Sequence, residues 1–295
     1  MPNPRDEMQA ILAQVGERLQ LDVSDAELLR LHSNALFLLR PSALVVRIAT
    51  NPAALDNVSA SLKVTRWLGR RGFPCVMPAE LDQPLVLRGH AISIWRYVES
   101  IGPASESSDL GKILAQLHAE PVPPQLRTFG DPLASISRAV GEHASAIEGW
   151  NGWLLNRIRQ LRHLWQDLQW PCPPALIHGD AHPGNLMRMP DGASILGDWD
   201  HTAVGPPEWD LVQVHYFQRR FGQPSTQDLD SFAQAYGRDL RSWPALGDLI
   251  SIREISGLSP YLRRASADAS ARNELLHRLQ TLEAFDSTTH WHSPK

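Results

Sequence analysis

The sequence predicts an α+β protein in which a small antiparallel sheet comes first and a mainly helical region follows. Short apolar runs bounded by turn residues lie between residues 28 and 98, which is typical of strands. From residue 107 onward, apolar residues recur at helical spacing over longer segments. A chain of 295 residues can bury a sizeable core, and this length favours two lobes over one.

The first region is predicted to hold five strands and two helices. His32 to Asn34 divide the first strand segment in two, Arg40 to Ser42 form a turn, and Gly89 lies in a hairpin turn. The predicted strand segments are residues 28–39, 43–49, 85–87 and 91–98, and the predicted helices are 7–19 and 51–71. Later helices are predicted at 107–118, 132–147, 152–168, from 211 onward, and at 227–240, 245–257 and 269–284.

Composition limits the classes of function and the compartment. The net charge of −4 gives no basic surface for nucleic acid. Cys75 and Cys172 are far apart and show no metal-binding spacing, which is typical of a reducing compartment. No apolar signal core follows the polar N-terminus, and no apolar run has transmembrane length. We therefore expect a cytoplasmic protein without a membrane or nucleic-acid partner.

The segment 175–200 carries the strongest functional pattern. Apolar residues 175–177 lead into a polar loop that contains His178, Asp180 and Asn185. The apolar pair Ile195 and Leu196 then precedes Asp198 and Asp200, after a turn signal at residues 190–192. Two strands joined by a turn form a hairpin, so the pattern predicts that 175–177 pairs with 195–196. Such a hairpin would bring Asp180, Asn185 and Asp198 together.

These residue types suit phosphoryl transfer from a nucleotide. One carboxylate must orient the acceptor hydroxyl and take its proton, while a carboxylate and an amide oxygen hold Mg²⁺ against the phosphates. The spacing His178-x-Asp180-x4-Asn185 is that of the catalytic loop of protein kinases. Asp198 follows at the position of the metal-binding aspartate in the same plan.

This stretch resembles the aminoglycoside phosphotransferase family, which includes choline, homoserine and fructosamine kinases. The family carries HGDxHxxN, then a DWD-like segment, then G-(D/P)-P-x-x-D-L, and residues 178–185, 198–200 and 205–211 match these in order. The resemblance implies a protein-kinase-like fold with two lobes. It divides the chain into a nucleotide-binding lobe, 1–98, and a catalytic and acceptor-binding helical lobe, 99–295. The implied reaction moves the γ-phosphate of ATP or GTP to a hydroxyl of a small molecule.

The family's functional positions fall on named residues here. Asp180 is expected to be the catalytic base, and Asn185 and Asp198 are expected to hold Mg²⁺, with Asp200 as a further ligand or a support. His178 and Asp210 are supporting positions, and Asp210 is expected in the first turn of a helix, where the helix dipole favours a carboxylate.

Nucleotide contacts are expected in the first lobe. Arg47 stands where the family's third strand carries its phosphate-binding cation, and its fork can hold phosphate oxygens. Arg96, Tyr97 and Val98 match the hinge between the lobes, whose backbone groups would contact adenine. Farther on, Arg253, Glu254 and Tyr261 are candidates for the wall of the acceptor cleft, with a solvated helix end as the alternative.

Two departures from the family pattern keep alternatives open. The predicted helix 51–71 has no glutamate to orient Arg47, and the loop at 32–34 has no glycine to approach the phosphates. A nucleotide-binding protein with little catalysis is therefore one alternative. A metallohydrolase that uses His178, His182 and the aspartates is another, since imidazole suits zinc. Acidic and basic residues nearly balance from 201 to 295, which argues against a polycationic acceptor.

Overall fold

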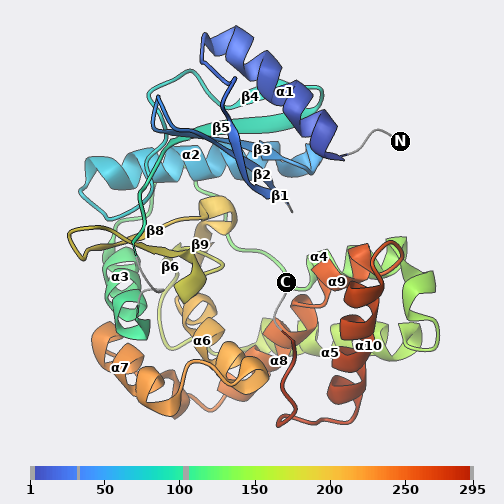
Figure 1. Cartoon of the computed structure of the whole chain (residues 1–295). Coiled ribbons are helices and arrows are strands. Elements are labelled where there is room, and N and C mark those ends of the chain that lie inside the picture. The colour runs from blue at the N-terminus through green and yellow to red at the C-terminus, as the bar shows by residue number, and fades with distance from the viewer. Residues whose placement is uncertain (1–3, 32–33, 102–105, 293–295) are drawn as a thin grey trace. The chain divides into compact units, whose positions relative to one another are not determined.

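The computed structural model describes residues 4–31, 34–101 and 106–292, which divide into two compact units (Figure 1). The first unit comprises Met1–Ser105 and Pro183–Thr202, and the second comprises Glu106–His182 and Ala203–Lys295. The chain thus returns once from the second unit to the first. Of the predicted loop at 32–34, residues His32 and Ser33 lie outside the described residues.

The first unit contains a five-stranded antiparallel sheet in the order β1-β2-β3-β5-β4. Its elements are α1 (Pro4–Leu19), β1 (Glu27–Leu31), β2 (Asn34–Leu39), β3 (Leu44–Ala49), η1 (Pro52–Ala54), α2 (Leu55–Arg70), β4 (Leu85–Leu87) and β5 (His90–Arg96). The returning segment adds η3 (Pro183–Asn185), β7 (Leu186–Arg188), β8 (Ser194–Leu196) and η4 (Trp199–His201). The predicted strands and helices of residues 7–98 are therefore present, with ends shifted by a few residues.

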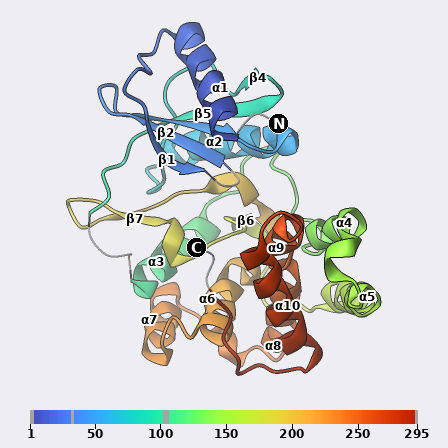
Figure 2. The same cartoon turned by 45° about the vertical axis from the view of Figure 1, so that its right-hand side comes forward.

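Different helices cover the two faces of this sheet. Val46 and Ile48 of β3 pack with α1, which lies against the sheet in both views (Figure 1, Figure 2). Val45 and Ala49 of the same strand belong instead to the cluster formed with α2. Because successive side chains of a strand point to opposite faces, Arg47 lies on the α2 face. It is only 7% exposed there, so a charged side chain is buried beneath a helix.

The second unit is mainly helical. Its elements are α3 (Ser107–Ala119), α4 (Ala134–Glu142), η2 (Ala144–Ile147), α5 (Asn151–Asp167), β6 (Ala175–Ile177), β9 (Ala203–Gly205), α6 (Glu208–Phe221), α7 (Thr226–Tyr236), η5 (Leu240–Ser242), α8 (Leu246–Ser256), α9 (Ser259–Arg264) and α10 (Ala269–Glu283). In this unit α3 packs along α7, and α6 packs along α8. Across the described ranges, no helix is both long and apolar enough to cross a bilayer.

The predicted pairing of residues 175–177 with 195–196 is wrong. β6 pairs antiparallel with β9, so that Leu176 lies opposite Val204. β8 pairs instead with β7, with Met187 opposite Ile195, and the predicted turn joins these two strands. Closing a short loop costs less conformational entropy than closing a long one, so the nearer strand β7 is the favoured partner of β8. Both overlooked strands, β7 and β9, have only three residues, too few to show an alternating pattern.

A buried histidine of α6 makes the stability of the second unit depend on pH. Burial lowers the pKa of His215 to about 4; the charge of Asp239 opposes this shift by a smaller amount, and the charge of Arg241 adds to it slightly. Between pH 6.5 and 4 the unfolded chain binds a proton that the folded chain does not. We therefore expect the free energy of unfolding to fall over this range, by up to about 3 kcal/mol.

Urea unfolding at a series of pH values measures this loss. His215→Gln should remove that part of the pH dependence, whereas His163→Gln, at an exposed position of α5, should leave it unchanged. Parallel pH profiles for the wild type and His215→Gln would show that His215 is not responsible.

Candidate active site

The loop that follows β6 is held by one buried carboxylate. Both oxygens of Asp210 accept backbone N–H bonds, from His178 at 2.7 Å and from Gly179 at 2.7 Å. Asp210 is fully buried in the first turn of α6, as the sequence predicts. Its Oδ2 also lies 3.1 Å from Nε2 of His118, whose Nδ1 is 2.9 Å from the hydroxyl of Tyr236. A carboxylate with several donors is well satisfied, so this loop has a fixed backbone.

Trp209, the residue before Asp210 on α6, makes a further hydrogen bond to this loop. The indole N–H of Trp209 donates to the carbonyl of Gly179 at 3.0 Å. Gly179 has a φ of +86°, in the left-handed region where a residue with a Cβ is strained. The sequence Gly179-Asp180 therefore turns sharply at a glycine whose N–H and C=O are both bonded to α6.

Asp180 lies directly after this turn, and its side chain is 38% exposed. Its Oδ1 accepts a hydrogen bond from Nη2 of Arg253 at 2.7 Å and a longer one from Nε2 of Gln213 at 3.4 Å. Nε of Arg253 donates in turn to Oε1 of Gln213. The guanidinium lies 4.6 Å from the centre of the Trp209 ring, within the range of a cation–π contact. A carboxylate that is braced yet partly exposed can receive a proton from a bound hydroxyl.

The two predicted metal ligands both lie in the first unit. Asn185 ends η3 just before β7, and its carbonyl accepts the N–H of Gly197 at 2.8 Å. This bond brings the backbone of Asn185 beside the residue that precedes Asp198. The Asp198 side chain is 45% exposed. Amide and carboxylate oxygens are ligands that Mg²⁺ accepts, commonly from one or two protein side chains with phosphates and waters, so this donor set fits a magnesium ion.

Asp198 has an unusual backbone conformation. Its φ of +57° and ψ of +60° are left-handed, a region that aspartate enters more readily than most residues with a Cβ. Residues held in such conformations cluster at functional sites. The turn redirects the chain at the end of β8, from Leu196 into η4.

Arg47 makes a two-pronged ion pair in the first unit. Nη1 donates to Oδ1 of Asp200 at 2.6 Å, and Nη2 donates to Oδ2 of the same carboxylate. Nη2 is also 3.8 Å from Oδ1 of Asp198. Burial alone would lower the pKa of Arg47, but the hydrogen bonds and charge of Asp200, helped by Asp198, raise it above its ordinary value. Arg47 is therefore a permanent cation beside a predicted metal ligand.

Asp200 provides the carboxylate partner for Arg47 that was expected from a glutamate on α2. Asp200 lies in η4, and η4 packs against α2, the helix on which a glutamate was expected. The Asp200 side chain is 16% exposed, so the pair is shielded from water on both sides. Bidentate pairing fixes the plane of the guanidinium as well as its position. Sequence alone gave no sign of this contact, since 153 residues separate its members.

The predicted hinge residues lie at the end of β5. Ser93 is the residue of β5 opposite Arg47. Arg96 is three residues farther along the strand, about 10 Å from Ser93 at the usual rise per residue. The N–H of Arg96 donates to Met77 at 2.9 Å, and the N–H of Tyr97 donates to Ala43 at 2.8 Å. The amides of Arg96 and Tyr97 are thus already bonded to carbonyl groups of the first unit. The assignment of Arg96, Tyr97 and Val98 to adenine binding stays a prediction.

Comparison with known families agrees with these features. The model of the phosphotransferase enzyme family matches residues 26–249, which is most of the chain and includes Arg47, Asp180, Asn185, Asp198, Asp200 and Asp210 but not Arg253. The chain belongs to this family. The predicted family is confirmed, and with it the prediction that the protein is a phosphotransferase of the small-molecule kinase class.

Solved structures confirm the predicted fold class of the phosphotransferase. Amicoumacin kinase hAmiN, in complex with AMP-PNP, Ca²⁺ and Ami, aligns with a TM-score of 0.70 at 13% identity over 95% of both chains. The GDP and kanamycin complex of APH(2")-IIia gives 0.65 at 18% identity, over 94% of this chain and 99% of that one. Choline kinase LicA from Streptococcus pneumoniae gives 0.65 at 16% identity, over 93% and 99%.

One curated relative also resembles the phosphotransferase in sequence. It is the uncharacterized protein YcbJ of Bacillus subtilis (strain 168), with 28% identity over 144 residues. The match covers 44% of this chain and 43% of YcbJ, so the chain matches less than half of that relative's length.

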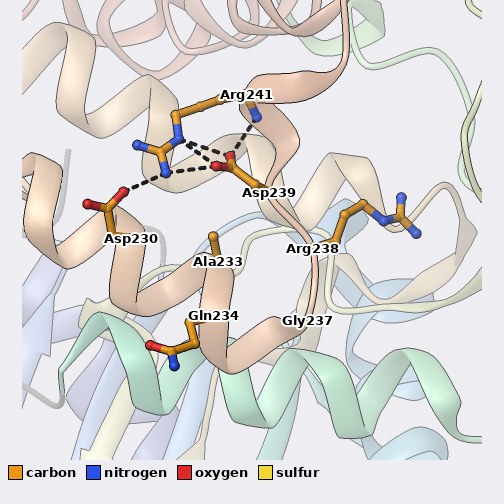
Figure 3. A pocket seen from close by; sticks show the side chains of 7 residues that line it. All are labelled: Asp230, Ala233, Gln234, Gly237, Arg238, Asp239 and Arg241. Atoms are coloured by element: carbon orange, nitrogen blue, oxygen red, sulfur yellow. Dashed lines mark hydrogen bonds and ion pairs between the residues drawn. The ribbon is translucent and has the colours of Figure 1, made fainter.

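Two other features of the phosphotransferase concern groups of metal-binding side chains and a surface hollow. Among the residues that the structure describes, no group of three or more His, Cys, Asp or Glu side chains is placed to hold a metal ion. A hollow of about 460 Å³ lies beside α7, and none of its lining residues is a predicted site residue. Figure 3 shows its lining side chains, among them Asp230 and Arg241. Arg241 there bonds to both Asp230 and Asp239, which neutralises much of its charge.

Replacing Arg47 should weaken nucleotide binding by the phosphotransferase. If the guanidinium contacts phosphate oxygens, Arg47→Ala should cost about 1.5–3 kcal/mol of ATP binding, the range for hydrogen bonds to charged groups. Arg47→Lys should restore only part, because an ammonium lacks the planar fork that also matches Asp200. Calorimetric titration with ATP measures both effects.

The control is Arg30→Ala, which removes an exposed arginine of β1 in the same unit. It should leave the affinity for ATP unchanged. An unchanged affinity in Arg47→Ala would make the ion pair with Asp200 purely structural.

Proposed function

We propose that this phosphotransferase is a magnesium-dependent kinase that moves the γ-phosphate of ATP or GTP to a hydroxyl group of a small molecule. The observation that carries the proposal is the braced, partly exposed Asp180 on a loop whose backbone is fixed by Asp210. A carboxylate with fixed position and access to solvent is suited to general-base catalysis. The chain then passes directly from this loop to Asn185 in the other unit.

Each unit contributes a separate part of the proposed chemistry. In the first unit, Arg47 holds phosphate oxygens of the nucleotide, and Asn185 and Asp198 are the residues that would hold Mg²⁺. When bound, the ion neutralises charge on the phosphates. In the second unit, Asp180 orients the acceptor hydroxyl and takes its proton. The hydroxyl oxygen forms a bond to the γ-phosphorus, the bond from that phosphorus to the bridging β–γ oxygen breaks, and the nucleoside diphosphate leaves.

A nucleotide donor has further support from similar structures. The similar chains named above include one complex with AMP-PNP and one with GDP, and a spectinomycin phosphotransferase aligns in complex with ADP. For the acceptor, we propose a compound without dense positive charge. Acidic and basic residues nearly balance from 201 to 295, and Asp180 itself is paired with Arg253. The proposed location is the cytoplasm.

A binding screen followed by a turnover assay tests the proposal. Mg²⁺ with ATP or GTP should raise the melting temperature of the protein. A diphosphate-release assay should then show transfer to a member of a panel of amino alcohols, sugars and antibiotics. Nucleotide binding with no transfer to any acceptor would favour a nucleotide-binding protein with little catalysis. Hydrolysis that needs zinc and no nucleotide would favour the metallohydrolase.

A further inference from the structure

We propose that Arg253, on α8, is a positioning residue that sets the orientation of the Asp180 carboxylate for proton transfer. This inference rests on the proposed kinase function and assigns a role to a residue outside the loop of Asp180. Arg253 is 12% exposed at its side chain, so it is not part of a solvated helix end. Its Nη2 lies 2.7 Å from Oδ1 of Asp180, 73 residues away in the sequence.

Arg253 is itself held on three sides. Its Nε donates to Gln213, its guanidinium lies 4.6 Å from the centre of the Trp209 ring, and its Nη2 donates to Asp180. Trp209 and Gln213 are four residues apart on α6, so they lie on the same face of that helix. The same Trp209 donates its indole N–H to Gly179. One helix face therefore braces both the backbone before Asp180 and the cation that bonds to its side chain.

The position of α8 is fixed by a second ion pair. Glu254, the residue after Arg253, accepts a hydrogen bond from Nε of Arg220 at 2.6 Å. Both side chains are 3% exposed. A buried ion pair that also satisfies hydrogen bonds tolerates little displacement. Because Arg220 is on α6, this pair fixes α8 against the helix that carries Trp209 and Gln213.

These contacts constrain one oxygen of Asp180 and thereby the direction of the other. A carboxylate is planar, so holding Oδ1 with Arg253 and Gln213 defines where Oδ2 points. In the proposed reaction Oδ2 is the oxygen that takes the proton. Misplacement of a catalytic group by about 1 Å can cost about 10²-fold in rate. Arg253 acts here through Asp180 and has no contact with the nucleotide in the proposed scheme.

Arg253→Met and Arg253→Lys test the proposal by steady-state turnover of Mg-ATP, with water as acceptor if no other acceptor is known. Methionine keeps packing on Trp209 but loses the N–H groups, so kcat should fall about 10- to 100-fold, as expected for a lost charged hydrogen bond. KM for ATP should stay unchanged, because phosphate binding is assigned to the other unit. Lysine should give an intermediate kcat, since one ammonium cannot reproduce the bonds to both Asp180 and Gln213.

A double variant separates positioning from simple structural support. In an Asp180→Asn background, Arg253→Met should cause no further loss of kcat, because its effect passes through Asp180. Arg219→Ala, which removes a neighbouring arginine that contacts Glu254 but not Asp180, should keep the wild-type kcat. Wild-type kcat in either Arg253 variant, or losses that multiply in the double variant, would overturn this inference alone. A wild type that turns over no nucleotide would overturn the proposed function, and this inference with it.

Discussion

Asp198→Ala is expected to lower magnesium-dependent nucleotide turnover by about 10³-fold or more. Asp198 and Asn185 are the two oxygen donors assigned to Mg²⁺, and metal-bound phosphates account for much of the charge stabilisation in phosphoryl transfer. Asp198 also lies 3.8 Å from Arg47, so its loss removes negative charge from the neighbourhood of the cation that is proposed to bind phosphate. Turnover at saturating ATP over a range of Mg²⁺ concentrations measures the effect.

Folding must be checked separately for this variant. Alanine tolerates the left-handed conformation of Asp198 less well than aspartate, at a cost of about 1–2 kcal/mol. The melting temperature of Asp198→Ala should therefore fall by a few degrees while the protein stays folded. Asp191→Ala, in the exposed turn between β7 and β8, is the matched control and should keep wild-type turnover. Turnover near the wild-type level in Asp198→Ala would remove Asp198 from the metal site.

The sequence predicted the fold because its local patterns agree with one another. The strands of the first unit alternate between apolar residues that face α1 and those that face α2, and turn residues separate them. The HGDxHxxN and DWD segments led to the family, which is confirmed, while their assignment of Asn185 and Asp198 to a metal ion stays a prediction. The pairing of residues 175–177 was the error, because three-residue strands carry too little pattern to select a partner.

Long-range contacts between charged side chains could not be predicted. The partner of Arg47 is Asp200, from a turn that packs on α2, and the partner of Asp180 is Arg253, from α8. In both cases a tertiary contact joins residues whose spacing follows no repeating pattern. Gln213 was overlooked for the same reason, although its place four residues after Trp209 on one helix face was a usable signal.

Asp180→Asn is expected to lower turnover by about 10²–10⁴-fold, the range for general-base assistance. Asparagine keeps the size and one oxygen of the side chain, so the bond from Arg253 can persist. However, asparagine lacks the negatively charged carboxylate oxygen that takes the proton in the proposed reaction. Binding of Mg-ATP should stay nearly unchanged, because Arg47, Asn185 and Asp198 all remain in the first unit.

Stability and binding must be measured on the same Asp180→Asn sample. Removing the charge leaves Arg253, at 12% exposure, without its carboxylate partner, and an unpaired buried charge destabilises the fold. A lower melting temperature is therefore expected and does not by itself explain a loss of turnover at 25 °C. Asp248→Asn, in the exposed first turn of α8, controls for the change of charge. If Asp180→Asn stays folded but loses metal and nucleotide binding together with activity, Asp180 is a metal ligand. That result would favour the metallohydrolase over the kinase.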